Sequence, residues 1–329
     1  MPPSGIVCDR RRFCGLLLAS AAAYATPSVM RAQRHIPPWR QPVASSRTIS
    51  IGGAAIQIDF SPGQIDLPQQ VILQWIEHAA TSVSAYYGRF PVPRYRVLVV
   101  SAPDRQGVGG GTTWGGVGGF PAFTRIHVGQ HSTQQDLTDD WTMTHEMIHT
   151  AFPTQSDEHH WIEEGLAVYV EPVARVQAGF LTPEKIWSDM VRDMPKGNPQ
   201  PGDQGLDQTH TWGRTYWGGA QFCLLADVTI RQQTGNRKGL QDALRAIVDA
   251  GGTIDKEWPL EKALTTGDGA TGTQVLMDQY RQMADAPVKV NLDQLWKKLG
   301  VEAVPSGGVR FSDSALLAPA RKAITGGGQ

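Results

Sequence analysis

The sequence predicts an α+β protein in which an N-terminal lobe with a mixed sheet precedes a mainly helical C-terminal lobe. All the segments with strand-like patterns precede residue 130, and helical spacing of apolar residues dominates the remainder. With 329 residues the chain can hold one large domain or two moderate ones. Its apolar fraction of 40% and mean hydropathy of −0.28 are typical of a globular protein.

The first 25 residues have the pattern of an export signal. Arg10, Arg11 and Arg12 precede an apolar stretch that is too short to span a bilayer, and the stretch ends in the small-residue pattern Ala23-Tyr24-Ala25. The arginine pair resembles the twin-arginine type, and the general secretory route is the alternative. We therefore expect a periplasmic or extracellular protein with no transmembrane segment in the mature chain.

The numbers of charged residues and of cysteines limit the partners and the disulfides that are expected. Lys and Arg total 30 and Asp and Glu total 31, so a nucleic-acid partner bound through its phosphates is not expected. Cleavage after residue 25 would leave Cys223 as the one cysteine of the mature chain, which excludes an internal disulfide.

The N-terminal lobe is predicted to span residues 49–135, after a proline-rich linker at 26–48. Gly107 to Gly119 form a glycine-rich stretch, which we interpret as a loop at the mouth of a cleft or as an edge strand that pairs with an extended peptide. The other predicted elements are a hairpin of 48–51 and 55–60, a helix at 68–87, and strands at 95–100 and 122–129.

The C-terminal lobe is predicted to span 136–304, followed by a weakly patterned tail at 305–329. Thr138 or Asp139 would cap a helix that ends near Phe152, and a second helix at 161–170 would end before Pro172. A Pro/Gly-rich stretch at 195–205 precedes predicted helices at about 215–234, 237–249, 272–284 and 291–299.

His145-Glu146-Met147-Ile148-His149 is the motif that indicates chemistry. Residues four apart lie on one face of a helix, so the two histidines can bind a single zinc ion. Glu146 then lies beside the metal, where it can take a proton from zinc-bound water as a general base. Histidines that pack or hydrogen-bond without a metal are the alternative.

A catalytic zinc site requires a third protein ligand. The segment Trp161-Ile162-Glu163-Glu164-Gly165 begins 12 residues after His149, which is enough for a turn and an antiparallel second helix. His159 and His160 fall in the expected turn, where we expect a surface role or support of the ligands. The metzincin pattern is excluded because Phe152 and Gln155 occupy its glycine and histidine positions.

These motifs resemble the gluzincin metallopeptidases, the clan of thermolysin, aminopeptidase N and the glycyl aminopeptidases. Glu164-Gly165-Leu166-Ala167-Val168-Tyr169 is similar to the phrase that carries their third ligand, so the resemblance implies Glu164 as the zinc ligand. Tyr216-Trp217-Gly218-Gly219-Ala220 is similar to a second phrase, which implies that Tyr216 stabilises the oxyanion of the tetrahedral intermediate. A packed aromatic role is the alternative for Tyr216, and Arg214 is a weaker second candidate for the oxyanion.

Two features of the gluzincin clan have no counterpart in this sequence. The aminopeptidase N carboxylate that holds the substrate's amino group is missing, because no Asp or Glu occurs from Gly107 to Gln135. The carboxylate usually found one turn after the third ligand is also missing. Asp157, Glu158 or Glu171 could orient a ligand histidine instead.

The function predicted from the sequence is therefore a zinc-dependent peptidase that acts on a peptide or protein substrate, with Zn²⁺ as its cofactor. A catalytically idle gluzincin relative and an exported peptide- or glycan-binding module are the alternatives. Four tryptophans lie close in sequence to the proposed site: Trp141, Trp161, Trp212 and Trp217.

Overall fold

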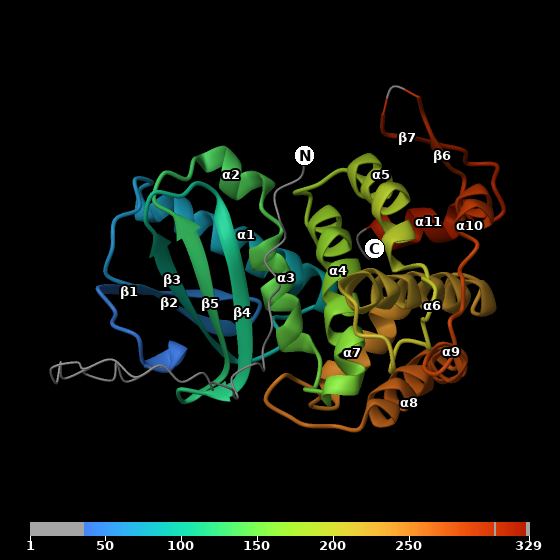
Figure 1. Ribbon diagram of the computed structural model, residues 1–329, viewed down its shortest axis with the longest axis horizontal. Coiled ribbons are helices and arrows are strands. Elements are labelled where there is room, and N and C mark those ends of the chain that lie inside the picture. The colour runs from blue at the N-terminus through green and yellow to red at the C-terminus, as the bar shows by residue number, and fades with distance from the viewer. Residues whose placement is uncertain (1–35, 306, 327–329) are drawn as a thin grey trace, which may run out of the picture.

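The computed structural model describes residues 36–305 and 307–326 (Figure 1). The predicted export signal at 1–25 and the first part of the predicted linker lie outside these residues. Within the described ranges, none of the helices combines the length and apolar character that a membrane span requires.

A five-stranded mixed sheet forms the N-terminal lobe, with strand order β1-β2-β3-β5-β4. The β1–β2 and β4–β5 pairs are antiparallel, whereas β3 is parallel to both β2 and β5. This sheet and the helical remainder of the chain confirm the predicted α+β class (Figure 1). The strands are β1 Ser45–Ile51, β2 Ala54–Phe60, β3 Arg94–Ala102, β4 Val108–Val117 and β5 Phe120–Gly129.

The interpretation of the glycine-rich stretch as a loop was wrong, because most of it is β4 at the edge of the sheet. Glycine contributes no apolar side chains, so the stretch lacks the alternation by which a strand is recognised. The strand is held by pairing with β5, through a tight turn in which Gly118 and Gly119 both have positive φ. The alternative prediction of an edge strand agrees with the structure.

The predicted linker also contains structure. Ser45 to Thr48 belong to β1, and the main-chain carbonyl of Trp39 accepts a hydrogen bond of 2.7 Å from Nη1 of Arg96 on β3. Polar strand residues such as Ser45, Ser46 and Arg47 show no alternation of their own, so pairing with β2 determines where β1 begins.

Helix α1 Gln69–Tyr87 lies beside the sheet and ends at Gly88, in good agreement with the prediction of 68–87. Gly88 has φ +79°, the left-handed conformation that commonly ends a helix. Apolar residues of α1 and of the inner strands, including Ile72, Ile76, Ile58 and Val97, are buried together in the core.

The segment predicted as one helix from residue 138 or 139 to 152 is divided in two. Helix α2 Gln134–Asp139 is capped by Thr133, and α3 Thr142–Ile148 is followed by a 3-10 turn at His149–Ala151. Asp140 is extended between the helices, and its Oδ2 accepts a hydrogen bond of 3.0 Å from the backbone amide of Met143. Asp140 therefore caps α3, rather than Thr138 or Asp139.

Helix α4 His160–Gln177 continues through Pro172, where the sequence had predicted an end. A proline inside a helix removes one backbone hydrogen bond. The helix is buried on most of its faces, with Tyr169 and Val173 both inside the core, and this packing maintains it beyond the proline.

Of the remaining helices, α5, α6 and α11 pack against α4, whereas α8, α9 and α10 lie farther from the sheet (Figure 1). The predictions near 215–234, 237–249, 272–284 and 291–299 correspond to α6, α7, α9 and α10, whereas α5, α8 and α11 were not predicted. The tail after residue 304 is also structured, because Arg321 of α11 is buried and donates to the main-chain carbonyls of Leu299 and Gly300. The bounds are α5 Pro183–Asp193, α6 Gly219–Gln233, α7 Leu240–Asp249, α8 Leu260–Thr271, α9 Val275–Met283, α10 Leu292–Leu299, α11 Ala318–Thr325, with short strands β6 Val301–Ala303 and β7 Val309–Phe311.

Helices α4 and α6 cross in direct backbone contact at Gly165 and Gly219. A Cβ atom on Gly165 would lie 2.3 Å from the carbonyl carbon of Gly219, and one on Gly219 would lie 2.2 Å from the carbonyl oxygen of Trp161. Any side chain at either position would push the helices apart. The two glycines thus allow α4 and α6 to pack in direct contact, next to the residues predicted to form the site.

Candidate metal centre

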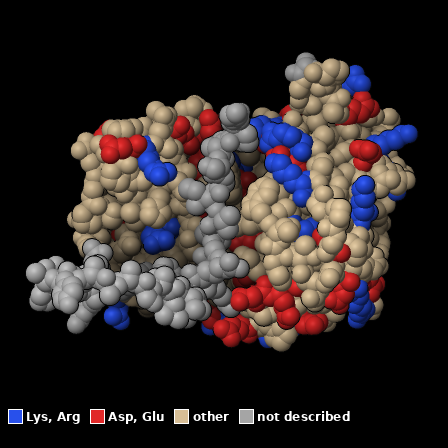
Figure 2. All heavy atoms as spheres, viewed as in Figure 1, with Lys and Arg blue, Asp and Glu red and all other residues tan. Residues whose placement is uncertain are grey.

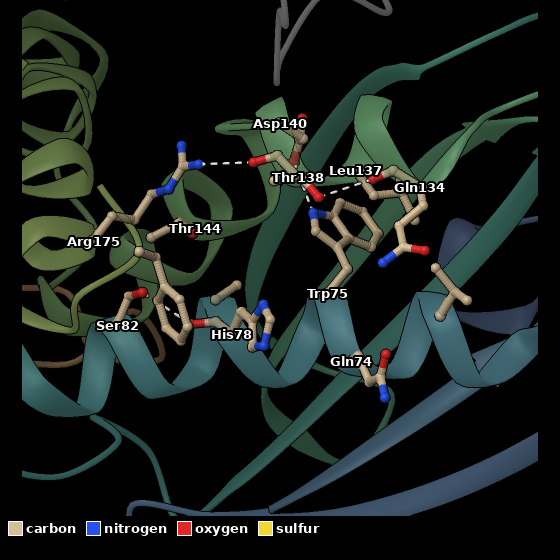
Figure 3. Close-up of a pocket in the computed structure, with 13 residues that line it drawn as sticks. Gln74, Trp75, His78, Ser82, Gln134, Leu137, Thr138, Asp140, Thr144 and Arg175 are labelled. Atoms are coloured by element: carbon tan, nitrogen blue, oxygen red, sulfur yellow. Dashed lines mark hydrogen bonds between the residues drawn. The ribbon is translucent and has the colours of Figure 1, made fainter. Parts of the chain in front are cut away.

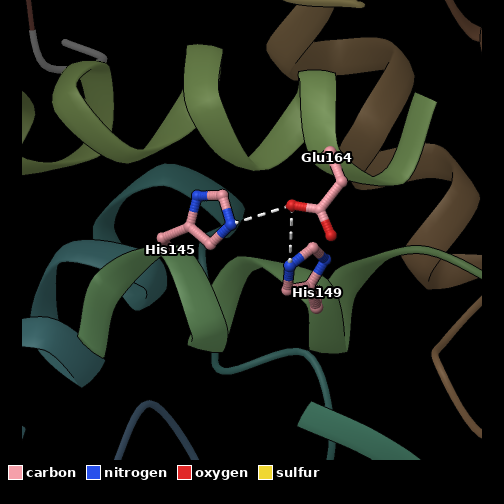
Figure 4. Close-up of side chains that lie close together, drawn as sticks. All are labelled: His145, His149 and Glu164. Atoms are coloured by element: carbon pink, nitrogen blue, oxygen red, sulfur yellow. Dashed lines mark hydrogen bonds and ion pairs between the residues drawn. The ribbon is translucent and has the colours of Figure 1, made fainter. Parts of the chain in front are cut away.

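Helices α3 and α4 bring His145, His149 and Glu164 together (Figure 4). Oε2 of Glu164 lies 3.1 Å from Nε2 of His145 and 3.7 Å from Nε2 of His149. Ligand atoms about 2.0–2.1 Å from a tetrahedral zinc ion are roughly 3.3 Å apart, so the cluster fits Zn²⁺ with little movement. All three side chains are buried, as a preformed site requires.

The charges within this cluster complement one another. Burial acts to raise the pKa of Glu164, but His149 and His145 outweigh it and hold that pKa well below its usual range. Burial likewise acts to lower the pKa of His145, and the contact with Glu164 raises it overall. The carboxylate is therefore ionised and directed at both imidazoles.

His160 holds the other oxygen of the same carboxylate. Its Nε2 lies 3.3 Å from Oε1 of Glu164, and its Nδ1 lies 3.1 Å from Oε2 of Glu163. The adjacent glutamates thus differ in position: Glu164 faces the histidines of α3, whereas Glu163 lies behind His160. His159 points elsewhere, with Nδ1 3.0 Å from Oδ1 of Asp207.

Two of the carboxylates predicted to orient a histidine are engaged with other groups. Glu158 lies 3.5 Å from Nε2 of His159, and Glu171 accepts a hydrogen bond of 2.9 Å from Nη1 of Arg175. Burial raises the pKa of Glu171 despite this partner. Among the described residues, Nδ1 of His145 is buried without a hydrogen-bond partner.

Glu146 lies on the side of α3 that faces the edge strand β4. Its Oε2 accepts a hydrogen bond of 2.6 Å from Oγ1 of Thr113. Gly111, two residues earlier on the same face of β4, leaves the space that Glu146 occupies, since a Cβ atom there would lie 2.6 Å from Cγ of Glu146. Neither Gly111 nor Thr113 was predicted from the sequence.

Tyr216 lies on a π-helical turn, Gly213–Gly218, that leads into α6. Its ring is nearly parallel to that of His145, with 6.4 Å between the ring centroids, so the structure brings Tyr216 to the cluster. Arg214 is not available there, because it is buried with Nε 2.7 Å from Oδ2 of Asp203 and with Nη1 donating to the carbonyl of Gly197. The secondary proposal of Arg214 for the oxyanion was wrong.

Comparison with known proteins defines the fold. No family model matches the chain, and no curated protein does. An aminopeptidase N family protein from Idiomarina loihiensis matches with a TM-score of 0.56 and 13% identity, over 79% of this chain and 50% of that chain. A two-domain M1 zinc metallopeptidase variant bound to L-arginine matches with a TM-score of 0.50 and 15% identity, over 76% and 54%.

The chain shares its fold with M1 zinc metallopeptidases. It spans about half the length of the solved structures that it matches. The predicted fold, an N-terminal lobe with a mixed sheet followed by a mainly helical C-terminal lobe, is thereby confirmed.

Two half-exposed tryptophans flank the cluster. Trp141 is 51% exposed and its ring lies 5.2 Å from that of His145, while Trp212 is 52% exposed and lies 5.9 Å from the ring of Tyr216. Trp161 has a structural role, since it is buried and donates from Nε1 to Oδ1 of Asp207. Trp141, His145, Tyr216 and Trp212 thus form a row of rings, which we call the aromatic rim.

A separate cavity of about 180 Å³ lies among α1, α2, α3 and α4 (Figure 3). Its polar groups bond to one another: Nε1 of Trp75 donates to Oδ2 of Asp140 over 3.2 Å, and Nη2 of Arg175 donates to the carbonyl of Thr138 over 3.1 Å. The lining includes Thr144 but none of the three residues of the metal-binding cluster. The hydrogen bonds in its lining hold Asp140 at the start of α3, and the cavity is not the predicted site.

The surface in Figure 2 carries charges of both signs. Charged side chains are sparse over the sheet lobe and more frequent over the helical part, where basic and acidic groups lie near one another. This mixture agrees with the nearly neutral composition. Where described residues are visible in Figure 2, basic side chains lie among acidic ones.

The close approach of Gly111 to Glu146 leads to a testable prediction. We expect Gly111→Ala to lower Tm by about 5 °C, because the new methyl group would displace the Glu146 side chain. Gly109→Ala is the matched control on the same strand, since its Cβ would lie 3.6 Å from Cβ of His127, an ordinary contact. Equal Tm values for the two variants would refute this role of Gly111.

Proposed function

We propose that this protein is a zinc-dependent peptidase in which His145, His149 and Glu164 hold Zn²⁺. The observation that carries the proposal is the buried cluster of these three side chains, with Glu146 adjacent on the same helix. The shared fold supports it at the level of architecture. Export to the periplasm or the exterior, predicted from residues 1–25, is part of the same proposal.

The residues around the cluster have complementary roles in the proposed reaction. When bound, Zn²⁺ supplies Lewis acidity and lowers the pKa of a water molecule that it holds. Glu146 accepts a proton from the attacking water and later delivers it to the leaving nitrogen. Tyr216 donates a hydrogen bond to the oxygen on which negative charge develops, and His160 keeps Glu164 in place.

Strand β4 is the proposed binding edge for the substrate. It is the last strand in the order of the sheet, and edge strands are a common means of holding an extended peptide. The segment from Val108 to Gly129 contains no carboxylate that could hold a free amino group. We therefore propose that cleavage does not require a free amino terminus.

The direct experiment combines metal analysis with digestion of paired peptides that differ only in acetylation of the amino terminus. We expect one zinc ion per chain and cleavage of both members of each pair. Bound zinc without cleavage across a broad library would indicate an idle relative. Absence of zinc, with glycan or peptide binding that survives His145→Ala, would instead indicate a binding module.

The aromatic rim leads to a prediction about side-chain preference. We expect Trp212→Ala to raise KM about 10-fold for peptides with a large apolar residue beside the scissile bond, because a stacking surface is lost. For peptides with alanine at the same place, KM is expected to change by less than about 3-fold. Phe180→Ala, a partly exposed aromatic that stacks on His78 instead, is the control variant. A loss of kcat with unchanged KM would contradict a binding role for Trp212.

A further inference from the structure

We propose that three buried hydroxyl groups of the sheet, those of Tyr95, Thr124 and Thr113, form a directed hydrogen-bond chain that positions the carboxylate of Glu146. The inference rests on the proposed function, in which Glu146 is the general base, and extends it to residues that no sequence motif indicated. Thr113 is then a positioning residue, since it acts on the reaction through Glu146.

The register of the sheet places the three hydroxyl groups in a row. Thr113 and Thr124 are directly opposite each other on β4 and β5, and Tyr95 on β3 pairs with Ala122, two residues before Thr124. Strand residues two apart point to the same face, so all three side chains lie on one face of the sheet. Tyr95, Thr124 and Thr113 are each 0% exposed.

The contacts are continuous from the sheet to α3. Oγ1 of Thr113 lies 2.6 Å from Oε2 of Glu146 and 2.6 Å from Oγ1 of Thr124. The hydroxyl of Tyr95 forms the next hydrogen bond, with Oγ1 of Thr124. No water molecule is needed to complete this chain.

The direction of the chain follows from its two ends. Thr113 has two acceptors on Glu146, the carboxylate oxygen Oε2 at 2.6 Å and the main-chain carbonyl at 3.0 Å, so its single hydroxyl proton is directed to Glu146 and chiefly to the nearer, charged oxygen. Thr113 must then accept from Thr124, and Thr124 must accept from the phenol of Tyr95. Burial raises the pKa of Tyr95 well above its ordinary value, so the phenol keeps the proton that it donates.

This arrangement restricts Glu146 from two sides. The hydroxyl chain fixes Oε2, and the missing side chain of Gly111 provides the space for Cγ. Hydrogen bonds in a chain polarise one another, and a bond to an ionised acceptor is stronger than a neutral one. Oε2 therefore serves as the anchor of the Glu146 carboxylate.

The kinetic test compares two substitutions of Thr113 with one of a buried threonine elsewhere. Thr113→Val keeps the shape of the side chain and removes the hydroxyl, so we expect kcat to fall about 10-fold or more with KM and zinc content unchanged. Thr113→Ser keeps the hydroxyl, so its kcat is expected to remain within about 3-fold of the parent value. Thr271→Val is the control, since Thr271 is also buried and its hydroxyl donates to the main-chain carbonyl of Gly267 on α8, outside the proposed site. Equal kcat in Thr113→Val and the parent would overturn the proposal.

A second measurement needs no catalysis. In the metal-free protein, Thr113→Val is expected to lower Tm by about 2–4 °C when Glu146 is present, and by clearly less in a Glu146→Met background. Equal losses in both backgrounds would mean that the hydroxyl does not act on the carboxylate, and the proposal would fail. If the parent cleaves no peptide, the proposed function fails. The comparison of Tm losses in the two backgrounds still decides whether the hydrogen-bond chain holds Glu146.

Discussion

Glu146→Gln is expected to reduce peptide hydrolysis by about 1,000-fold while one zinc ion per chain is retained. Glutamine has nearly the same shape and can still accept a hydrogen bond from Thr113, but it cannot take a proton from water. Because His145, His149 and Glu164 are unchanged, metal binding should be preserved. The substitution therefore separates the chemical step from assembly of the site.

The measurements are the initial rate on a cleaved peptide, the zinc stoichiometry, and Tm as a check on folding. Equal rates for the parent and Glu146→Gln would rule out Glu146 as the base. A loss of zinc in this variant would assign Glu146 to the metal instead, because a general base beside the ion should not affect its retention.

Glu164→Gln is expected to weaken zinc binding by more than about 100-fold, and Glu163→Gln by less than about 10-fold. The two substitutions are chemically identical and adjacent, yet Glu164 faces both histidines of α3, whereas Glu163 contacts His160. Removal of the negative charge at Glu164 deprives the ion of an anionic ligand. Removal of the charge at Glu163 affects only a residue that supports this ligand.

Competition with a chromophoric chelator measures both affinities directly, and activity in excess zinc provides a second readout. The opposite order of the two variants would make Glu163 the third ligand. Similar affinities for both variants and the parent would exclude both glutamates as the third ligand.

The part of the site that could be predicted from the sequence is the part that is local in the chain. His145, Glu146 and His149 share one helical turn, so their relative placement follows from helix geometry alone. Glu164 needed the resemblance to gluzincins, since spacing by itself could not distinguish it from Glu163. The row of rings at the aromatic rim was only suggested by proximity in sequence.

Contacts between distant segments were not predictable in this way. Thr113 and Gly111 meet Glu146 across more than 30 residues of sequence, and the glycines that allow this approach conceal the strand pattern of β4. The sequence predicted that a helix would end before Pro172, but packing keeps α4 helical through this residue. The segment predicted as one helix is divided at Asp140, whose side chain accepts a hydrogen bond from the backbone amide of Met143. Fold class was therefore better predicted than the number and the boundaries of the helices.

The glycine crossing of α4 and α6 also limits how the elements around the metal-binding cluster can move. Sliding or rotation at Gly165 and Gly219 would bring backbone atoms into collision, so the two helices should behave as one rigid body. Glu164 and the turn that carries Tyr216 both belong to this body. We expect opening for substrate entry to take place at the boundary with β4, while the separation of Glu164 and Tyr216 stays constant during turnover.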